Sequence, residues 1–132
     1  MNRPTSKTRS QELTRAELEI MQILWEKGHA LVHDIRDAMP EPRPAYNTVS
    51  TVVRILETKG FVGHTPYGRT HEYHPLTSRE EYTDRYMTGV LGNFFGGSPV
   101  QMVSFLSKRE NISTKELDSI IEILEELKNE SK

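Results

Sequence analysis

The short polar side chains between residues 45 and 60 are the part of this sequence best suited to binding a partner. Asn47, Ser50, Thr51 and Arg54 recur at the three- and four-residue spacing that places side chains on one face of a helix. Asn and Arg side chains bond to the edges of bases, and Ser, Thr and Arg side chains bond to phosphate oxygens. This face also lacks the Glu and Lys pairs that are typical of a helix surface in water. Taken alone, a face of short polar side chains is usually just solvated, so its interpretation as a DNA-binding surface depends on the elements around it.

A second group of reactive side chains, in the stretch "THEYH" at 70–74, has the residue types of a metal site but not the spacing. On a strand, His71 and His74 point to opposite faces. Their spacing also differs from that of the helical zinc-protease motif. We predict no metal and no cofactor. Because the sequence offers neither a phosphate-binding loop nor paired carboxylates in an evident cleft, an enzyme is not expected.

The composition favours a soluble protein of a reducing compartment. The 132 residues include no cysteine, which excludes disulfides and thiolate zinc sites. No apolar run approaches the length of a membrane span. Residues 1–12, which we interpret as a flexible N-terminus, are polar and lack the apolar core of a signal peptide. We expect a cytoplasmic protein without direct membrane contact. The net charge of −2 does not by itself suggest nucleic acid.

Three helices are expected to position the polar face. The capping-box pair Thr14 and Glu17 begins a helix over 14–27, and a second, shorter helix is expected over 31–39. The apolar spacing of 45–59 predicts the third helix in spite of its Val and Thr content.

A hairpin is expected to follow the third helix directly. Strand-like runs at 61–65 and 69–76 flank a turn at 66–68. Three helices and a hairpin make a winged helix-turn-helix domain, which we assign to residues 13–76. In that fold the third helix enters the DNA major groove and the hairpin lies along the backbone, where we expect Arg69 to contact phosphate with help from His64 or His71. The predicted DNA-binding residues are Arg43, Tyr46, Asn47, Thr48, Ser50, Thr51, Arg54, Lys59, His64 and Arg69.

The remaining residues, 77–132, predict a helical region through which the chain dimerises. Helices are expected over 78–95, from Pro99 and from Ser113. Three short helices bury little surface on their own, so their apolar stripes favour pairing with a second copy. The predicted dimer interface consists of Tyr82, Tyr86, Val90, Phe94, Phe105, Leu117, Ile120, Ile121 and Leu124. The predicted fold is thus mainly α with a small β-hairpin, a winged helix-turn-helix domain followed by a helical dimerisation arm.

Four phrases of the sequence resemble the penicillinase repressor family of bacterial transcription regulators: "LTRAELEIMQILWEKG", "NTVSTVVRILETKGFVGH", "GRTHEYHPL" and "ISTKELDSIIEILEEL". The resemblance implies a homodimer of winged helices that represses transcription by binding an inverted-repeat operator in double-stranded DNA. It carries the operator contacts of the third helix onto Asn47, Thr48, Ser50, Thr51 and Arg54. The copper-responsive branch of the family ends in cysteine pairs, which this chain lacks, so copper sensing is not expected.

The resemblance also implies that a membrane-bound metalloprotease sensor relieves repression by cutting the repressor. The scissile Asn-Phe bond of the family aligns with Ser104-Phe105, where serine replaces asparagine. We expect Phe105 to be buried, because it belongs to the apolar set of its helix. One alternative function remains open, a winged-helix module that binds protein rather than DNA.

Overall fold

The computed structural model describes residues 12–109 and 111–131. Within them the chain divides into two compact units, Met1–Tyr86 and Met87–Lys132. We call the first the winged-helix unit and the second the C-terminal unit. The first unit therefore reaches further along the chain than the predicted domain over 13–76.

Helix α2 (Arg15–Lys27) begins at the predicted capping box. Its first turn is closed by hydrogen bonds between Thr14 and Glu17, since each side chain accepts a bond from the other residue's backbone N–H. Gly28 ends the helix with a positive φ of 86°, a conformation that glycine adopts without a Cβ clash.

The second predicted helix is shorter than expected. Ala30 and Leu31 form strand β1 (Ala30–Leu31) by pairing with β3, so helix α3 (Val32–Asp37) begins only after them. At its other end, the helix stops before Met39, which precedes Pro40 and is disfavoured from the helical region by the proline ring. Predicting the helix over 31–39 was therefore wrong at both ends, although Val32, Ile35 and Met39 are buried as expected.

Helix α4 (Tyr46–Lys59) confirms that apolar spacing outweighs β-propensity in this stretch. Val49, Val53 and Leu56 are buried on one face. Gly60 ends the helix in the left-handed conformation, and Phe61 enters the core immediately afterwards, with its N–H bonded to the Leu56 carbonyl. This turn brings the chain directly from α4 into the hairpin.

The hairpin consists of β2 (Val62–Tyr67) and β3 (Thr70–Pro75), and β1 joins the other edge of β3. Tyr67 pairs with Thr70, so the connecting turn contains only Gly68 and Arg69. The prediction of a turn at 66–68 was therefore wrong, because Pro66 and Tyr67 lie within β2. Proline is tolerated there because β2 is an edge strand and one of its sides has no ladder bond to make.

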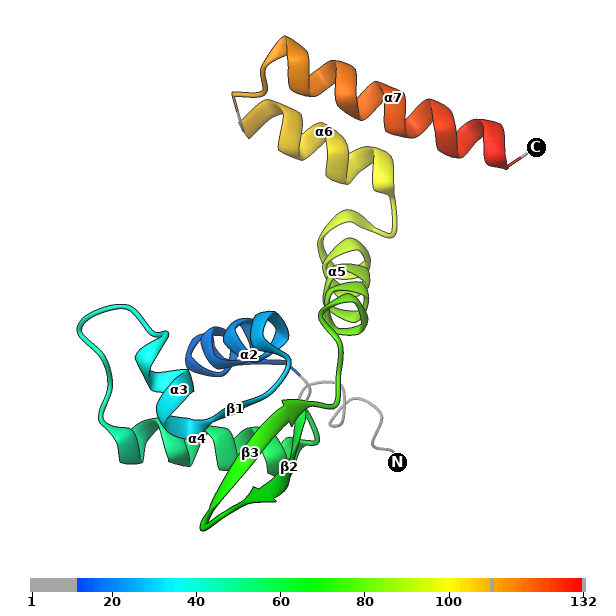
Figure 1. Ribbon diagram of the computed structural model, residues 1–132. Helices are drawn as coiled ribbons and strands as arrows, with labels where there is room; N and C mark the ends of the chain where they lie inside the picture. The colour runs from blue at the N-terminus through cyan, green and yellow to red at the C-terminus, as the bar shows by residue number, and fades with distance from the viewer. Residues whose placement is uncertain (1–11, 110, 132) are drawn as a thin grey trace. The chain divides into compact units, whose positions relative to one another are not determined.

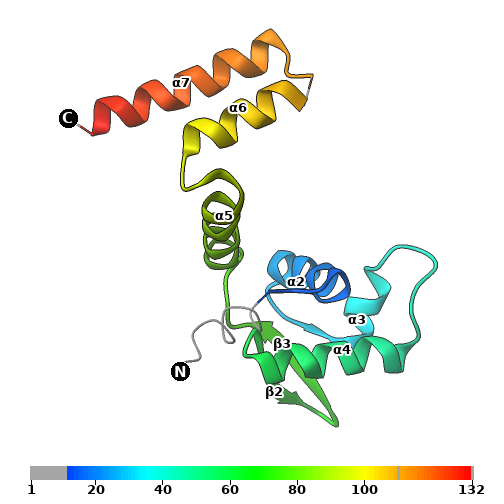
Figure 2. The same ribbon diagram turned by 180° about the vertical axis from the view of Figure 1, so that it is seen from behind.

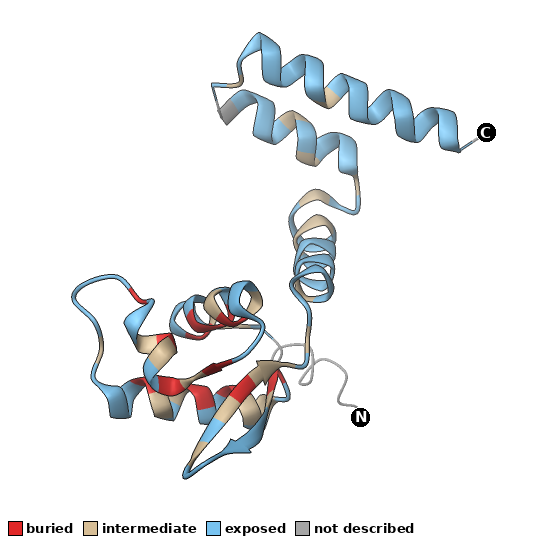
Figure 3. Cartoon of the chain, in the orientation of Figure 1, coloured by how far each residue is buried: buried red, intermediate tan, exposed pale blue. Residues whose placement is uncertain are grey.

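The buried core belongs to the winged-helix unit. α2, α3 and α4 lie against one another and against the sheet (Figures 1 and 2). The buried residues, coloured red in Figure 3, all lie within these elements and the segments that join them. The hydrophobic core includes Ile20, Met21, Leu24, Ile35, Val49, Val53, Leu56, Phe61, Val62 and Tyr73.

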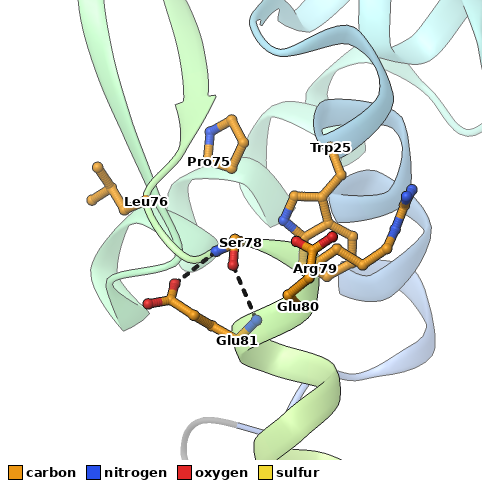
Figure 4. Close-up of a pocket in the computed structure, with 7 residues that line it drawn as sticks. All are labelled: Trp25, Pro75, Leu76, Ser78, Arg79, Glu80 and Glu81. Carbon is orange, nitrogen blue, oxygen red and sulfur yellow. Dashed lines mark hydrogen bonds between the residues drawn. The ribbon is translucent and has the colours of Figure 1, made fainter. Parts of the chain in front are cut away.

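The first turns of helix α5 (Arg79–Phe95) also belong to the winged-helix unit. Tyr82 packs on Trp25 and Phe61, with ring centroids 6.2 and 6.0 Å away, and its hydroxyl accepts a bond from the Leu13 N–H. Ser78 and Glu81 form the capping box of α5, which Figure 4 shows beside Trp25 and Arg79. An open cavity of about 380 Å³ lies between Trp25, the end of β3 and the first turn of α5.

The C-terminal unit contains the rest of α5 together with α6 (Pro99–Arg109) and α7 (Thr114–Glu130). α6 and α7 run side by side in opposite directions (Figures 1 and 2). The predicted capping box of Ser113 and Glu116 begins α7. No side chain of α5 or α7 is buried. Among the described residues, no helix combines the length and apolarity needed to cross a membrane.

Candidate DNA interface

The polar face of α4 lies opposite the side chains that hold the helix in the core. Asn47, Thr48, Thr51 and Arg54 are exposed, and Ser50 is half-buried. Because Val49, Val53 and Leu56 are buried on the other side, the helix cannot rotate without exposing apolar surface. The core therefore fixes which side chains of α4 face outward.

The N-terminal end of α4 carries no compensating negative charge. Its N-cap, Ala45, has no side-chain oxygen to accept from the first-turn N–H groups, and the first turn contains no acidic residue. Such a helix end has a partial positive charge that attracts anions. Tyr46 stands at this end and is about half exposed.

A cleft of about 240 Å³ separates the polar face of α4 from the hairpin. Arg54 of α4 and Arg69 of the hairpin turn both line it, together with His71 of β3. The remaining lining residues are Val32, Tyr46, Ser50, Glu57, Thr70 and Tyr73. Two guanidinium groups and several hydroxyls on facing walls form a site suited to phosphate.

The sequence model of the penicillinase repressor family matches residues 13–126. The chain belongs to the penicillinase repressor family. It is 26% identical over 122 residues to the penicillinase repressor of Bacillus licheniformis, covering 92% of this chain and 95% of that protein. It is 23% identical over 114 residues to the methicillin resistance regulatory protein MecI of Mammaliicoccus sciuri, covering 86% of this chain and 93% of that protein.

A solved structure supports the fold. An ArsR-like transcriptional regulator from Rhodococcus sp. RHA1 aligns with a TM-score of 0.50 and 14% identity, covering 82% of this chain and 97% of that one. Family membership decides between the classes of function left open by the sequence: the chain is a DNA-binding transcriptional repressor of the winged-helix type and not an enzyme. The alternative of a module that binds only protein is therefore not favoured.

In this member of the penicillinase repressor family, the face of the hairpin toward α4 carries three aromatic side chains, those of His64, His71 and Tyr73. The imidazole rings of His64 and His71 are stacked, with centroids 4.0 Å apart and an interplanar angle of 9°. Tyr73 contacts both rings and is buried. On the α4 side, the Glu57 carboxylate bonds to Nδ1 of His64. His64 was predicted to bind DNA, but its Nδ1 already has this partner.

The surroundings of Tyr73 keep its phenol neutral. Burial raises the pKa of Tyr73, and the negative charge of Glu57 raises it further, against the smaller opposing effect of Arg54. The phenol therefore keeps its proton at neutral pH.

Glu57 and Tyr73 were not predicted as parts of the site. The strand register that places His71 and Tyr73 beside α4 depends on the two-residue turn, which the sequence interpretation had placed one or two residues too early.

Two of the predicted DNA-binding cations already hold the winged-helix unit together. Lys59 Nζ lies 2.9 Å from both carboxylate oxygens of Glu17, which is 4% exposed. Arg43 donates to the backbone carbonyls of Asp37 and Met39 and pairs with Glu41, across the loop between α3 and α4. We therefore leave Lys59 and Arg43 out of the interface proposed below.

The described residues include one group with metal-ligand chemistry, His33, Asp34 and Asp37 on α3. These side chains are between 46% and 63% exposed. The two carboxylates lie 3.5 and 3.7 Å from the imidazole nitrogens of His33. Exposed acidic groups of this kind are common without a metal, and nothing else in their surroundings points to an ion. The group is therefore best interpreted as ordinary exposed side chains of α3.

The predicted dimer residues separate into two sets. Tyr82 packs inside the winged-helix unit, and Tyr86 stacks on it with centroids 6.0 Å apart. The others belong to the C-terminal unit, where Val90 and Ile120 are half-buried and the rest are exposed: Phe94, Phe105, Leu117, Ile121 and Leu124. The expectation that Phe105 is buried was wrong, because 47% of it is exposed beside Phe95, with ring centroids 5.5 Å apart.

Proposed function

We propose that this chain is a cytoplasmic homodimeric repressor that binds an inverted-repeat DNA operator through α4 and the hairpin. The observation that carries the proposal is the polar face of α4. Its exposed Asn, Thr and Arg side chains lie opposite a buried apolar face. Asn47, Thr51 and Arg54 have the lengths and hydrogen-bonding groups that reach base edges in the major groove. Arg69, across the cleft, binds the backbone.

Exposed apolar surface on the C-terminal unit supports the dimer. We define the dimer surface as Phe94, Phe105, Leu117, Ile121 and Leu124. Each of these residues is at least 42% exposed in the single chain. Exposed apolar side chains that gather on one unit of a soluble protein mark an interaction surface, and we propose that a second copy covers this one. Two α4 helices then read half-sites about one helical turn, roughly 10 bp, apart.

Relief of repression is proposed to follow proteolysis by a membrane-bound metalloprotease sensor. The bond between Ser104 and Phe105 lies inside α6, so a protease reaches it only when the helix opens locally. The cut separates α7 from the rest of the chain and removes part of the dimer surface. Bivalent DNA binding is then lost. Mass measurement of the protein from induced cells checks this step, and a chain that remains at 15.2 kDa under full induction contradicts it.

Selection of bound duplexes from a random-sequence DNA library tests the proposed function. An inverted repeat should emerge, and Arg54→Ala and Thr51→Ala should each weaken binding to it by roughly 1–3 kcal/mol in a mobility-shift titration. Arg15→Ala is the matched control, because Arg15 is an exposed cation at the start of α2. Failure to enrich any sequence, or equal affinities for all four proteins, would contradict the proposal.

A further inference from the structure

The stacked histidines of the hairpin are not accounted for by the contacts that hold the fold together. His64 in β2 and His71 in β3 are diagonal neighbours across the strands, since His64 pairs with Tyr73 and Pro66 pairs with His71. Both residues are exposed. Their ring planes differ by only 9° and their centroids lie 4.0 Å apart, so charge on one ring is felt directly by the other.

The two histidines differ in their access to the cleft. Nδ1 of His64 bonds to the Glu57 carboxylate. His71 instead lines the cleft, together with Arg54, Arg69, Ser50 and Thr70. A phosphate bound in the cleft therefore meets His71, whereas His64 stacks on the His71 ring and is not among the residues that line the cleft.

The charged and titratable groups around the pair come from three elements. α4 contributes Tyr46, Arg54 and Glu57, the hairpin turn contributes Arg69, and β3 contributes Tyr73. Glu57 is the single carboxylate among these residues, and it is bonded to His64. A phosphate held by Arg54 and Arg69 would bring negative charge to His71 in the same cleft. Negative charge beside an imidazole favours its protonated form.

We propose that His71 is an additional phosphate-binding residue of the operator site and that it takes up a proton when DNA binds. The proposal rests on the proposed DNA-binding function of the cleft. The protonated ring donates a hydrogen bond to a backbone phosphate oxygen, and the proton comes from solvent. By linkage, the complex holds more protons than the free partners, so affinity is greatest at low pH and falls as pH rises through the range in which histidine titrates.

The experiment compares the pH dependence of DNA binding in the full-length protein and in His71→Asn. The probe is the duplex recovered by selection, at constant salt and between pH 6 and pH 8. We expect the affinity of the unaltered protein to fall about tenfold more than that of His71→Asn over this range, as one linked proton allows. Calorimetry in buffers of different ionisation enthalpy should detect proton uptake of up to about one per protomer, and none for His71→Asn.

His29→Asn is the matched control. His29 is also exposed and pairs with a hairpin carboxylate, Glu72, but it does not line the cleft. This variant should keep the pH dependence and the proton uptake of the unaltered protein. NMR titration of the histidine rings gives a second measurement, in which the His71 signals should titrate at higher pH with DNA than without it.

The outcomes separate the two proposals. Binding to the selected duplex with the same pH profile in the unaltered protein and in His71→Asn overturns the role of His71 and leaves the DNA-binding function in place. Loss of the pH dependence in His29→Asn also overturns the role of His71 and leaves the DNA-binding function in place. Absence of binding to any duplex between pH 6 and pH 8 overturns both.

Discussion

The indole Nε1 of Trp25 donates a hydrogen bond to the backbone carbonyl of Thr77, 2.8 Å away. This bond joins α2 to the segment that leads from β3 into α5. Arg79, two residues beyond Thr77, lies over the Trp25 ring at 5.6 Å. The start of α5 is therefore held by the same helix that supports the core beneath α4.

Loss of the Trp25 donor should destabilise the winged-helix unit. Trp25→Phe keeps an aromatic ring but leaves the Thr77 carbonyl without this partner, which should cost about 1–2 kcal/mol. Urea unfolding measures the change. Tyr82→Phe is a useful comparison, because it removes only the hydroxyl that accepts from Leu13. An unchanged unfolding midpoint for Trp25→Phe would show that the bond adds nothing to stability.

The ion pair between Glu17 and Lys59 should be strongly stabilising at neutral pH. The Glu17 side chain is 5% exposed and that of Lys59 25%, so Lys59→Met leaves a buried carboxylate without its counter-charge. We expect a loss of about 3 kcal/mol in the free energy of unfolding. Glu17→Gln combined with Lys59→Met should restore part of it. Lys27→Met, at an exposed position of α2, serves as the control, and a loss equal to that of Lys59→Met there would contradict the assignment.

The same pair predicts a pH dependence of stability. Burial by itself would raise the pKa of Glu17, but the hydrogen bonds from Lys59 and Thr14 and the charge of Lys59 lower it below its ordinary value of 4.5. A lowered pKa stabilises the fold above the ordinary value, and this stabilisation is lost as pH falls through the folded-state pKa. Urea unfolding between pH 7 and pH 3 should therefore show a smaller acid loss for Glu17→Gln than for the unaltered protein. Parallel curves would exclude this contribution.

Arg69 should contribute to DNA affinity without reading sequence. Arg69→Ala is expected to weaken binding to all duplexes about equally and to lower the slope of log affinity against log salt by about 1, because one phosphate contact is lost. Anisotropy titrations at several salt concentrations measure the slope. If Arg69→Ala affects one operator variant and spares the others, Arg69 contacts bases instead.

A charge within the dimer surface should produce monomers. Ile121→Lys places an ammonium group on the apolar stripe of α7, where Ile121 is 51% exposed in the single chain. Sedimentation should show dissociation over the concentration range in which the unaltered protein dimerises. Ile123→Lys is the matched control, since Ile123 is equally apolar and 57% exposed but lies off the stripe. Dimers of undiminished stability in Ile121→Lys would place the interface elsewhere.

Local patterns in the sequence predicted the elements that carry the site, for identifiable physical reasons. The apolar spacing of Val49, Val53 and Leu56 predicted α4, and Gly60 marked its end, because both signals arise within a few residues of the chain. Strand β1 was not predicted, since two residues have no period and pair only because β3 lies beside them. The hairpin turn was misplaced because Pro66 was interpreted as a turn residue, although an edge strand accepts it.

The partners of individual side chains were harder to predict. Lys59 and Arg43 have the charge of DNA contacts, but charge does not reveal that Glu17 and the carbonyls of Asp37 and Met39 are already within reach. Tyr82 belongs to an apolar stripe, and the stripe does not say whether it meets Trp25 or a second copy. Glu57 and His71 line one cleft only because of the strand register. These relationships depend on distant segments of the chain.

Pro66 has a consequence for the behaviour of the protein at high concentration. β2 is the outer strand of the sheet and most of its side chains are exposed, and an exposed outer strand can recruit strands from other molecules and begin aggregation. Proline has no N–H to offer to an incoming strand, and β1, at the opposite edge, has only two residues with which to pair. The hairpin can therefore remain uncovered in solution, where it is available to DNA, without acting as a template for fibres.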